Sequence, residues 1–308
     1  MADIVVSEFM DEAALAAARP DYDVLYAPDL VDQPEALLAE IATAKGLIVR
    51  NRTQVRGALL DAATDLKVVG RLGVGLDNID MAECEARGIA VRPATGANDL
   101  SVAEYVITSA LVLLRGAYHA SDAVAAGEWP RGRLMGREIS GKILGLVGYG
   151  AIARETARRA EALGMRIIGF DPFLEEGAPQ WGNTAKVALQ TLLQSADVVS
   201  LHVPLTDETR NLIDDTALRS MKSDAILINA ARGGVVNEAA LAALLREGHL
   251  GGAALDVFQT EPVSVQDGAK FADIPNLILT PHIAGVTAES NVRVSEVTVT
   301  NVLSVLQS

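Results

Sequence analysis

Three polar side chains in the second half of the chain have the types needed to move a proton beside a bound carboxylate. Arg232, Glu261 and His282 each lie beyond a short apolar run that reads as a strand. An imidazole titrates near pH ~6.5 and suits reversible proton transfer. A neighbouring carboxylate favours the charged form of the imidazole. A guanidinium can bind a substrate carboxylate through two parallel hydrogen bonds. Taken singly, each is more often a surface or structural residue. Because ligands of open parallel sheets bind outside the carboxyl ends of strands, we expect the three to converge.

A glycine-rich turn supplies a second chemical signal. The segment Gly148–Ala153 matches G-x-G-x-x-G/A between an apolar run and a helical pattern, with Ala at the last position. In such a turn the first Gly allows the bend, the second lets the backbone approach a pyrophosphate, and amides of the helix N-terminus face the phosphates. Asp171 ends the next apolar run, 171 − 148 = 23 residues after the first Gly. An acid there binds ribose hydroxyls and repels a 2′-phosphate, which favours NAD over NADP.

Short apolar runs, which predict strands, alternate along the chain with helical patterns. This alternation is typical of proteins with parallel sheets, whose strands and helices could position these residues. The expected strands are Ile4–Val6, Gly46–Val49, Lys67–Gly70, Ile89–Val91, Ile143–Val147, Arg166–Phe170, Val198–His202, Ala225–Asn229, Gly252–Leu255 and Leu277–Leu279. The expected helices are Asp11–Ala18, Pro34–Ala44, Gly57–Ala63, Asp80–Arg87, Asn98–Ala117, Ile152–Leu163, Leu189–Ser195, Asp214–Ser220, Glu238–Glu247 and Ala288–Leu306. The segment Arg115–Lys142 reads as a loop.

The length of 308 residues predicts two domains. The second series of strands starts after the helix that begins near Asn98 and ends near His282, and we expect the last helix to return to the first domain. The fold class is therefore α/β, with two Rossmann-like doubly wound parallel-sheet domains and a cleft between them. Residues 1–97 with 283–308 form the expected substrate-binding domain, and residues 98–282 the expected NAD-binding domain.

Composition narrows the function classes. A formal charge of −14 argues against nucleic-acid binding, and it fits either ordinary solubility or adaptation to a salty cytoplasm. Cys84 is the single cysteine, so no intrachain disulfide can form, and no His/Cys/carboxylate cluster has metal-binding spacing. The N-terminus reads as a strand without a signal peptide, and no apolar stretch reaches the ~20 residues of a membrane span. We expect a cytoplasmic protein with no membrane, nucleic-acid or metal partner.

The chain resembles the D-isomer-specific 2-hydroxyacid dehydrogenase family over nearly its whole length. The segments that carry the resemblance are Arg71–Asp80, Gly148–Ala153, His202–Thr206, Asn229–Gly234, Ala254–Glu261 and Pro281–Gly285. The resemblance implies an NAD-dependent oxidoreductase that moves a hydride between nicotinamide and a small anionic 2-hydroxy acid. It makes His282 the acid/base, Glu261 its partner and Arg232 the group that binds the substrate carboxylate.

The same resemblance assigns binding roles by position. The implied cofactor-binding residues are Gly148, Gly150, Ala151, Ile152, Asp171, His202, Val203, Pro204, Thr209, Ala230, Ala231, Asp256, His282 and Gly285. The implied substrate-binding residues are Arg50, Arg52, Arg71, Val74, Gly75, Arg232 and His282. Among these, Asp256 would hold the nicotinamide carboxamide, and backbone amides near Val74 and Gly75 would bind the substrate carboxylate.

The extra arginines of the first domain indicate a second anionic group on the substrate, although ordinary salt bridging would also account for them. The pattern is similar to the phosphoglycerate-dehydrogenase-like subgroup, in which the region Asn98–Arg137 typically builds a homodimer. Residues 49–55, with Pro281–Thr287, are similar to (S)-sulfolactate dehydrogenases, whose substrate carries a sulfonate where phosphoglycerate carries a phosphate ester. We favour sulfolactate.

Other functions remain as alternatives. 3-Phosphoglycerate is the second candidate substrate, and it is disfavoured by a chain that ends at Ser308 without the regulatory extension that many such enzymes carry. Hydroxypyruvate or glyoxylate is the third. A non-catalytic NADH-sensing protein is a distant alternative, because such proteins keep the catalytic residues. Formate enzymes of this type place Gln opposite the histidine, and Glu261 argues against that activity.

Overall fold

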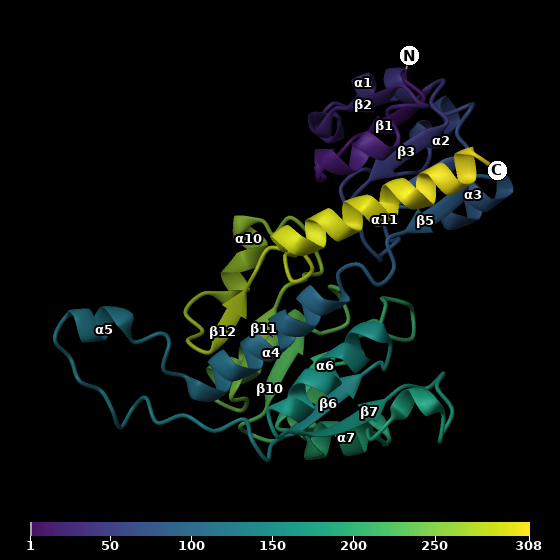
Figure 1. The fold of residues 1–308 in the computed structure, drawn as a ribbon. Helices are drawn as coiled ribbons and strands as arrows, with labels where there is room; N and C mark the ends of the chain where they lie inside the picture. The colour runs from purple at the N-terminus through teal and green to yellow at the C-terminus, as the bar shows by residue number, and fades with distance from the viewer. Residues whose placement is uncertain (1) are drawn as a thin grey trace. The chain divides into compact units, whose positions relative to one another are not determined.

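The computed structural model describes residues 2–308, and Met1 lies outside the described residues. The chain forms two compact units: unit 1 is Met1–Asn98 with Val286–Ser308, and unit 2 is Asp99–Gly285 (Figure 1). The boundaries expected from the sequence lie one and three residues from these divisions.

Unit 1 is built on a five-stranded parallel sheet of order β2-β1-β3-β4-β5. Its elements are β1 Ile4–Val6, η1 Glu12–Ala17, β2 Val24–Tyr26, η2 Pro28–Asp32, α1 Pro34–Ile41, β3 Gly46–Val49, α2 Ala58–Ala62, β4 Val68–Arg71, α3 Met81–Ala86, β5 Ala90–Pro93 and α11 Ala288–Leu306. Alternate strand residues face opposite layers, as the period of a strand requires. Val5 and Leu47 pack with α1 and α2, whereas Ile4 and Ile48 pack with η1 and α11.

The C-terminal helix α11 packs closely against strands β3, β4 and β5 of this sheet. A Cβ on Gly70 of β4 would lie 2.6 Å from Val302 and 2.8 Å from Thr298, so only glycine admits the helix at this distance. Thr287 caps the helix by accepting a hydrogen bond from the Ser290 amide at 3.1 Å. The expected return of the last helix to the first part of the chain is what the structure has.

Unit 2 is built on a seven-stranded parallel sheet of order β12-β11-β10-β9-β6-β7-β8. Its elements are α4 Asp99–Arg115, α5 Ser121–Ala125, β6 Ile143–Val147, α6 Ala151–Ala162, β7 Arg166–Phe170, η3 Pro179–Trp181, β8 Ala185–Lys186, α7 Leu189–Ser195, β9 Val198–Leu201, α8 Asp215–Ser220, β10 Ile226–Asn229, α9 Glu238–Arg246, β11 Gly252–Leu255, α10 Val265–Gly268, η4 Ala269–Phe271 and β12 Leu277–Leu279.

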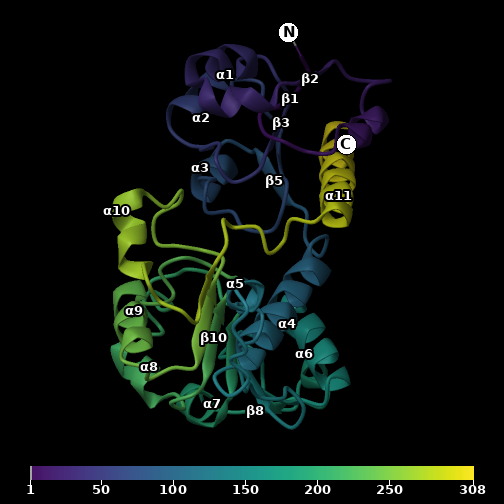
Figure 2. The same cartoon turned by 90° about the vertical axis from the view of Figure 1, so that its left-hand side faces the viewer.

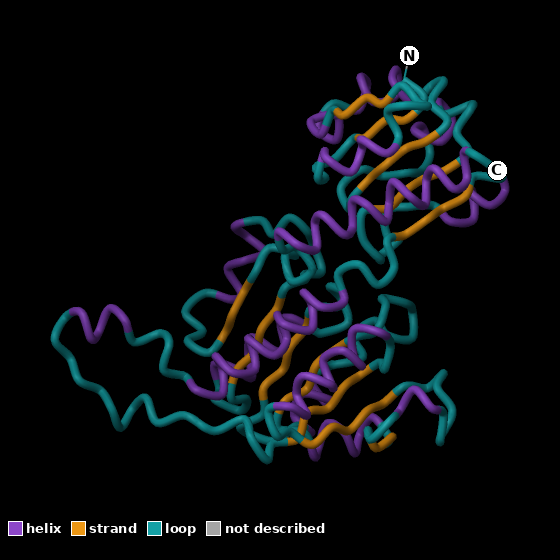
Figure 3. Tube along the Cα trace, viewed as in Figure 1, coloured by secondary structure: helices purple, strands orange, loops and turns teal. Residues whose placement is uncertain are grey.

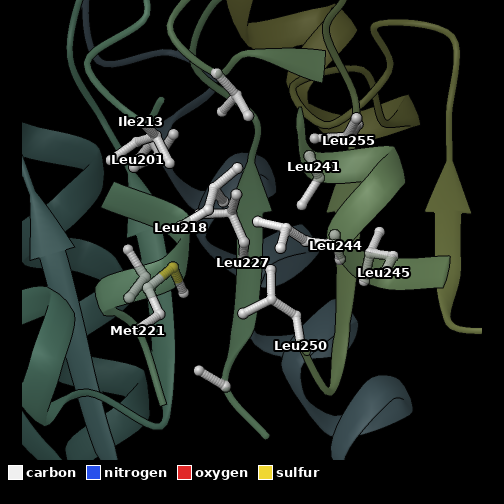
Figure 4. Packing of buried hydrophobic residues seen from close by; sticks show 14 of the residues in the cluster. Leu201, Ile213, Leu218, Met221, Leu227, Leu241, Leu244, Leu245, Leu250 and Leu255 are labelled. Carbon is white, nitrogen blue, oxygen red and sulfur yellow. The ribbon is translucent and has the colours of Figure 1, made fainter. Parts of the chain in front are cut away.

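Helices cover both faces of the unit 2 sheet. In Figure 2 the helices α8 and α9 lie on one side of β10, and α4 and α6 lie on the other. Leu227 of β10 packs with Leu218 of α8 and Leu241 of α9 (Figure 4). Ile226 and Ile228 of the same strand belong to the cluster that includes α4 and α6. Strand β10 is therefore buried on both faces, which explains its continuous apolar run in the sequence.

Between α4 and β6 the chain forms a long arm, residues 116–142. It extends away from the sheet of unit 2, with the short helix α5 near its tip (Figures 1 and 3). Tyr118, Trp129 and Met135 on the arm are 67%, 77% and 83% exposed. Arg137 pairs with Asp224 at 2.6 Å where the arm returns to the unit. The arm thus presents large apolar side chains that its own unit does not cover.

The structure departs from the expected elements in several places. Strands β2 and β8 were not expected: β8 has two exposed residues, and the three residues of β2 are only half-buried, so neither carries a strong apolar pattern. Residues Glu12–Ala17 form a 3-10 helix where an α-helix was expected, and the loop Arg115–Lys142 contains α5. Throughout residues 2–308, no helix has the length and apolar character to cross a membrane, and no group of His, Cys, Asp or Glu side chains is arranged to hold a metal ion.

Candidate active site

Strand pairing brings the three predicted catalytic residues to one edge of unit 2. Strands β10, β11 and β12 are neighbours in parallel register, with Asn229 opposite Leu255 at their carboxyl ends. Arg232 follows β10, Glu261 lies in the loop after β11, and His282 follows β12. The loops beyond these strand ends therefore form one surface, as expected for a ligand site of an open parallel sheet.

His282 and Glu261 are in direct contact. Nδ1 of His282 lies 2.7 Å from Oε2 of Glu261, and the amide of Phe258 donates to Oε1 at 2.8 Å. Burial opposes ionisation of this carboxyl, but the hydrogen bonds from His282 and Phe258 and the charge of Arg232 together lower the pKa of Glu261. Glu261 is therefore a carboxylate that accepts from Nδ1, which leaves Nε2 as the ring nitrogen for proton exchange with a substrate.

The backbone of His282 is fixed in an unusual conformation. Its φ is 54°, in the left-handed region that costs a non-glycine residue about 1 kcal/mol. Its amide donates to the carbonyls of Asp256 at 2.8 Å and Thr280 at 3.1 Å. The next two amides, of Ile283 and Ala284, both donate to the Asp256 carboxylate at 2.8 Å. Surrounding contacts that hold a strained backbone are typical of functional sites.

Asp256 is the centre of a buried hydrogen-bond chain. The residue is 1% exposed, and Oγ1 of Thr280 donates to its Oδ1 at 2.6 Å. Since that hydroxyl proton is committed to Asp256, Oγ1 of Thr280 accepts from the hydroxyl of Tyr105 on α4, 2.7 Å away. Asp256 thus takes three donors of its own chain, and a carboxylate has about four acceptor sites. The role predicted for it on the nicotinamide carboxamide stays a prediction.

The turn that carries Arg232 is shaped by two neighbours. The side chain of Asn229 donates to the Arg232 carbonyl at 2.9 Å and accepts from the Ala231 amide at 3.1 Å. A Cβ on Gly233 would lie 1.8 Å from the carbonyl oxygen of Phe258, so glycine is required for the turn to approach the loop that holds Glu261. Close approach of these two loops gives Arg232 its electrostatic influence on Glu261.

Glu238 stabilises the loop that holds Glu261. It is 5% exposed, accepts from the Gln259 amide at 2.6 Å and pairs with Lys270 at 2.6 Å. The sequence reasoning assigned no role to Glu238, Thr280 or Tyr105, because their partners lie 21 to 175 residues away along the chain.

The glycine turn after β6 has the shape that a pyrophosphate needs. Gly148 has φ 84°, and a Cβ there would lie 2.7 Å from the His202 carbonyl oxygen. Gly150 caps α6 without a side-chain hydrogen bond, and a Cβ there would meet no atom within 4 Å. The first turn of α6 carries no acidic residue. Open space over uncapped helix amides fits a dinucleotide phosphate, and Ala151 and Ile152 begin this helix.

Asp171 directly follows β7 and lies beside that turn. Its Oδ2 accepts from the Tyr149 amide and its Oδ1 from the Phe173 amide, both at 2.9 Å. Tyr149 in turn stacks on buried Trp181, with ring centroids 4.6 Å apart. The carboxylate is thereby held against the glycine turn, where it fits the ribose hydroxyls of NAD.

His202 and the loop that follows β9 lie on the other side of β6, where the strand order reverses. Burial lowers the pKa of His202 to about 4, and its Nε2 lies 3.0 Å from Oγ of Ser200. Oγ1 of Thr209 donates to the Pro204 carbonyl at 2.6 Å and so closes this loop. The remaining predicted cofactor residues are Val203 in this segment, Ala230 and Ala231 after β10, and Gly285 at the end of unit 2.

The other predicted substrate residues belong to unit 1, at the carboxyl ends of β3 and β4. Nη2 of Arg50 donates to Asn291 at 2.7 Å, Arg52 pairs with Asp32, and Nη1 of Arg71 donates to the Leu72 carbonyl at 2.9 Å. Val74, 38% exposed, and Gly75 follow in the loop after β4.

Comparison with known proteins identifies the class. Residues 107–284 match the model of the D-isomer specific 2-hydroxyacid dehydrogenase NAD-binding domain. The chain belongs to this family, so the expected family, α/β fold and NAD cofactor are confirmed.

Individual relatives extend the match to the whole chain. The (S)-sulfolactate dehydrogenase of Chromohalobacter salexigens is 54% identical over 303 residues, which cover 98% of this chain and 97% of that one. The D-3-phosphoglycerate dehydrogenase of Bacillus subtilis is 42% identical over 257 residues, 83% of this chain and 48% of the relative. The chain therefore spans about half the length of that enzyme.

Solved structures show the same architecture. The TT0316 protein of Thermus thermophilus superposes with a TM-score of 0.90 at 34% identity, covering 99% of this chain and 96% of that one. The D-lactate dehydrogenase of Aquifex aeolicus, complexed with NAD and lactic acid, superposes with a TM-score of 0.87 at 29% identity, covering 99% and 95%.

Proposed function

We propose that the enzyme interconverts (S)-sulfolactate and sulfopyruvate with NAD as hydride acceptor. The observation that carries the reaction type is the His282–Glu261 pair at 2.7 Å, on the same strand edge as Arg232. The substrate assignment is supported by the 54% identity to an (S)-sulfolactate dehydrogenase over nearly the full length of both chains.

The proposed chemistry follows from the pair. As the substrate is oxidised, Nε2 of His282 takes the proton of the C2 hydroxyl; in the reverse direction it returns that proton to the C2 oxygen. NAD supplies the acceptor for the hydride that leaves C2, so the products are the 2-oxo acid, NADH and one proton. Glu261 fixes the ring through Nδ1 and stabilises the imidazolium that forms.

Binding of the substrate is assigned to arginines and backbone amides. Arg232 would bind the carboxylate and polarise the C2 oxygen, a task suited to a planar guanidinium. The amides of Val74 and Gly75 would bind the same carboxylate, and Arg50, Arg52 and Arg71 would serve a second anionic group. Support for these roles comes from the positions of the residues at the carboxyl ends of strands.

Two other substrates have support of their own. 3-Phosphoglycerate is the second candidate, given the 42% identity to a phosphoglycerate dehydrogenase. Hydroxypyruvate is the third, because the hydroxypyruvate reductase of Thermotoga maritima is 38% identical over 85% of both chains.

The decisive experiment measures NADH oxidation by the purified protein with sulfopyruvate, 3-phosphohydroxypyruvate, hydroxypyruvate and glyoxylate, at moderate and at high salt. We expect the highest kcat/KM for sulfopyruvate. A higher kcat/KM for one of the other acids would replace the substrate assignment, and turnover of none of the four would overturn it.

We also propose that the enzyme is a homodimer that associates through the arm, residues 116–142. The support is the exposure of Tyr118, Trp129 and Met135 on a segment that extends from its own unit (Figure 1). Light scattering after size-exclusion chromatography should give twice the 32.4 kDa of one chain. The double variant Trp129→Ser, Met135→Ser should give a monomer, and a monomeric unaltered protein would refute the proposal.

We place the protein in the cytoplasm. The support is Cys84, a free and fully buried thiol in a chain whose single cysteine leaves no intrachain disulfide to form. Fractionation of cells that produce the tagged protein tests this, and recovery from any other fraction would contradict it.

A further inference from the structure

Five residues of unit 1 form a charged cluster at the carboxyl ends of β1 and β3. Glu8 and Phe9 follow β1, Arg50 and Arg52 follow β3, and Asn291 lies on α11. We call these residues the β1–β3 cluster. Strands β1 and β3 are neighbours in the order β2-β1-β3-β4-β5, and they mark the point at which the strand order reverses. Ligands of doubly wound sheets bind at such points.

Arg50 is the member of the cluster whose hydrogen bonding is incomplete. Its guanidinium is largely buried, donates through Nη2 to Asn291 at 2.7 Å and lies 5.6 Å from the centre of the Phe9 ring. Its Nε is buried and has no hydrogen-bond acceptor among residues 2–308. A buried charged donor without an acceptor is unfavourable. A guanidinium forms strong, charge-assisted hydrogen bonds with anionic oxygens, so Arg50 is the residue of the cluster that we expect to contact an anion.

Carboxylates balance the positive charges of this cluster. Glu8 is 4% exposed, and its oxygens accept from the amides of Arg50 at 2.9 Å, Thr53 at 2.9 Å and Arg52 at 3.1 Å. The negative charge of Glu8 therefore lies beside the backbone amides of both Arg50 and Arg52. The guanidinium of Arg52 is paired with Asp32. Two guanidinium charges thus face two carboxylate charges.

We propose that the β1–β3 cluster binds a singly charged anionic group and discriminates against a doubly charged one. This inference rests on the proposed function, and it specifies which second anion of the substrate the site accepts. A phosphate ester carries about −1.5 to −2 charges at pH 7, whereas a sulfonate carries one. The additional charge is repelled by buried Glu8, and the neighbouring charge of Arg52 is already paired with Asp32. Glu8 and Asp32 are thus specificity-determining residues for sulfonate over phosphate.

The first test varies the substrate charge and leaves the protein unchanged. The second pKa of a phosphate ester lies near 6, so 3-phosphohydroxypyruvate becomes singly charged at that group between pH 7.5 and 5.5. The ratio of its kcat/KM to that of sulfopyruvate should rise severalfold over this interval. Because both substrates use the same catalytic groups, the ratio removes the pH dependence of the enzyme itself. A ratio that is flat or falls would overturn the proposal.

The second test varies the charge of the protein. Asp32→Asn should release Arg52 and shift the same ratio about tenfold toward the phosphorylated acid at pH 7.5, the effect of one charge at short range. Glu8→Gln should shift it in the same direction, and it keeps one oxygen to accept from the amides of Arg50 and Thr53. The matched control is Asp61→Asn, which removes an exposed carboxylate paired with Arg87 on the same unit. Equal ratios in Asp32→Asn and the control would overturn the proposal.

A binding measurement separates this inference from the substrate assignment. Turnover of neither acid by the unaltered enzyme would refute the proposed function alone. Thermal stabilisation by methanesulfonate and by methyl phosphate would then report the charge preference directly. Stronger stabilisation by methanesulfonate, reversed in Asp32→Asn, is the expected result, and equal or stronger stabilisation of the unaltered protein by methyl phosphate would refute the inference.

Discussion

Oγ1 of Thr280 lies 2.6 Å from Oδ1 of Asp256, and the same carboxylate oxygen accepts the amide of Ile283 at 2.8 Å. The Thr280 hydroxyl thus fixes the group that holds the chain just after His282. Through Tyr105, 2.7 Å from Thr280, the contact extends to helix α4. Thr280 thereby helps to position the imidazole of His282, the proposed acid/base.

Thr280→Val, which keeps the shape but removes the hydroxyl, should lower kcat about tenfold. The reason is that Asp256 loses a buried donor and holds the His282 backbone less firmly. The matched control is Thr280→Ser, which restores the hydroxyl and should recover most of kcat. Steady-state kinetics and thermal unfolding of both variants separate the effects: equal losses of kcat in Val and Ser would mean that only packing matters.

Arg232→Ala should abolish turnover, with a loss of at least about 10³-fold in kcat/KM, because Arg232 is the residue that we propose as the bidentate partner of the substrate carboxylate. The Asn229 turn does not depend on the Arg232 side chain, so NADH binding should be preserved. Fluorescence titration with NADH and stopped-flow assays check both parts. Activity close to that of the unaltered enzyme would remove Arg232 from the catalytic assignment.

Asp171→Ala should relax the preference for NAD over NADP, because the charge that repels a 2′-phosphate disappears. We expect the ratio of kcat/KM values for NADH and NADPH to fall about tenfold or more. Asp171→Asn is a useful control, since its side-chain oxygen still accepts a backbone hydrogen bond. If the ratio is the same in all three proteins, Asp171 does not select the cofactor.

His202 should make unit 2 less stable in mild acid. Its pKa is about 4 in the folded chain and about 6.5 when exposed, so the unfolded state binds the proton more readily between these values. The neutral ring contributes fully above pH ~6.5, and up to about 3 kcal/mol is lost as the pH falls through 4. Urea unfolding at several pH values, compared with His202→Gln, measures this. Parallel stability curves for the two proteins would contradict it.

Strong local patterns made much of this fold predictable. The strands Ile143–Val147, Arg166–Phe170 and Gly252–Leu255 have the expected bounds because buried parallel strands are continuous apolar runs. Strand β8 has no such signal, since it is an exposed edge of two residues. The contact of Tyr105 with Thr280 spans 175 residues and depends on packing between α4 and the sheet, which no local pattern encodes.

The contacts between carboxylates and arginines in unit 1 could not be predicted from the sequence either. The sequence indicated that Arg50 and Arg52 serve an anion, but it did not indicate that Glu8 and Asp32 lie beside them. Glu8 follows a different strand, and it reaches the Arg50 loop only because β1 and β3 are adjacent. Residue types predicted the class of chemistry. Which carboxylates lie beside Arg50 and Arg52 can be seen only in the folded structure.

The two tryptophans of the chain occupy opposite environments, and this difference gives the enzyme two optical reporters. Trp181 is 5% exposed and stacked on Tyr149, whereas Trp129 on the arm is 77% exposed. Acrylamide should quench the red-edge emission of Trp129 first and leave the blue emission of Trp181. When the two signals are resolved, the emission of Trp129 reports association through the arm, and the emission of Trp181 reports changes near the glycine turn of unit 2. Both can be followed in one sample without an attached dye.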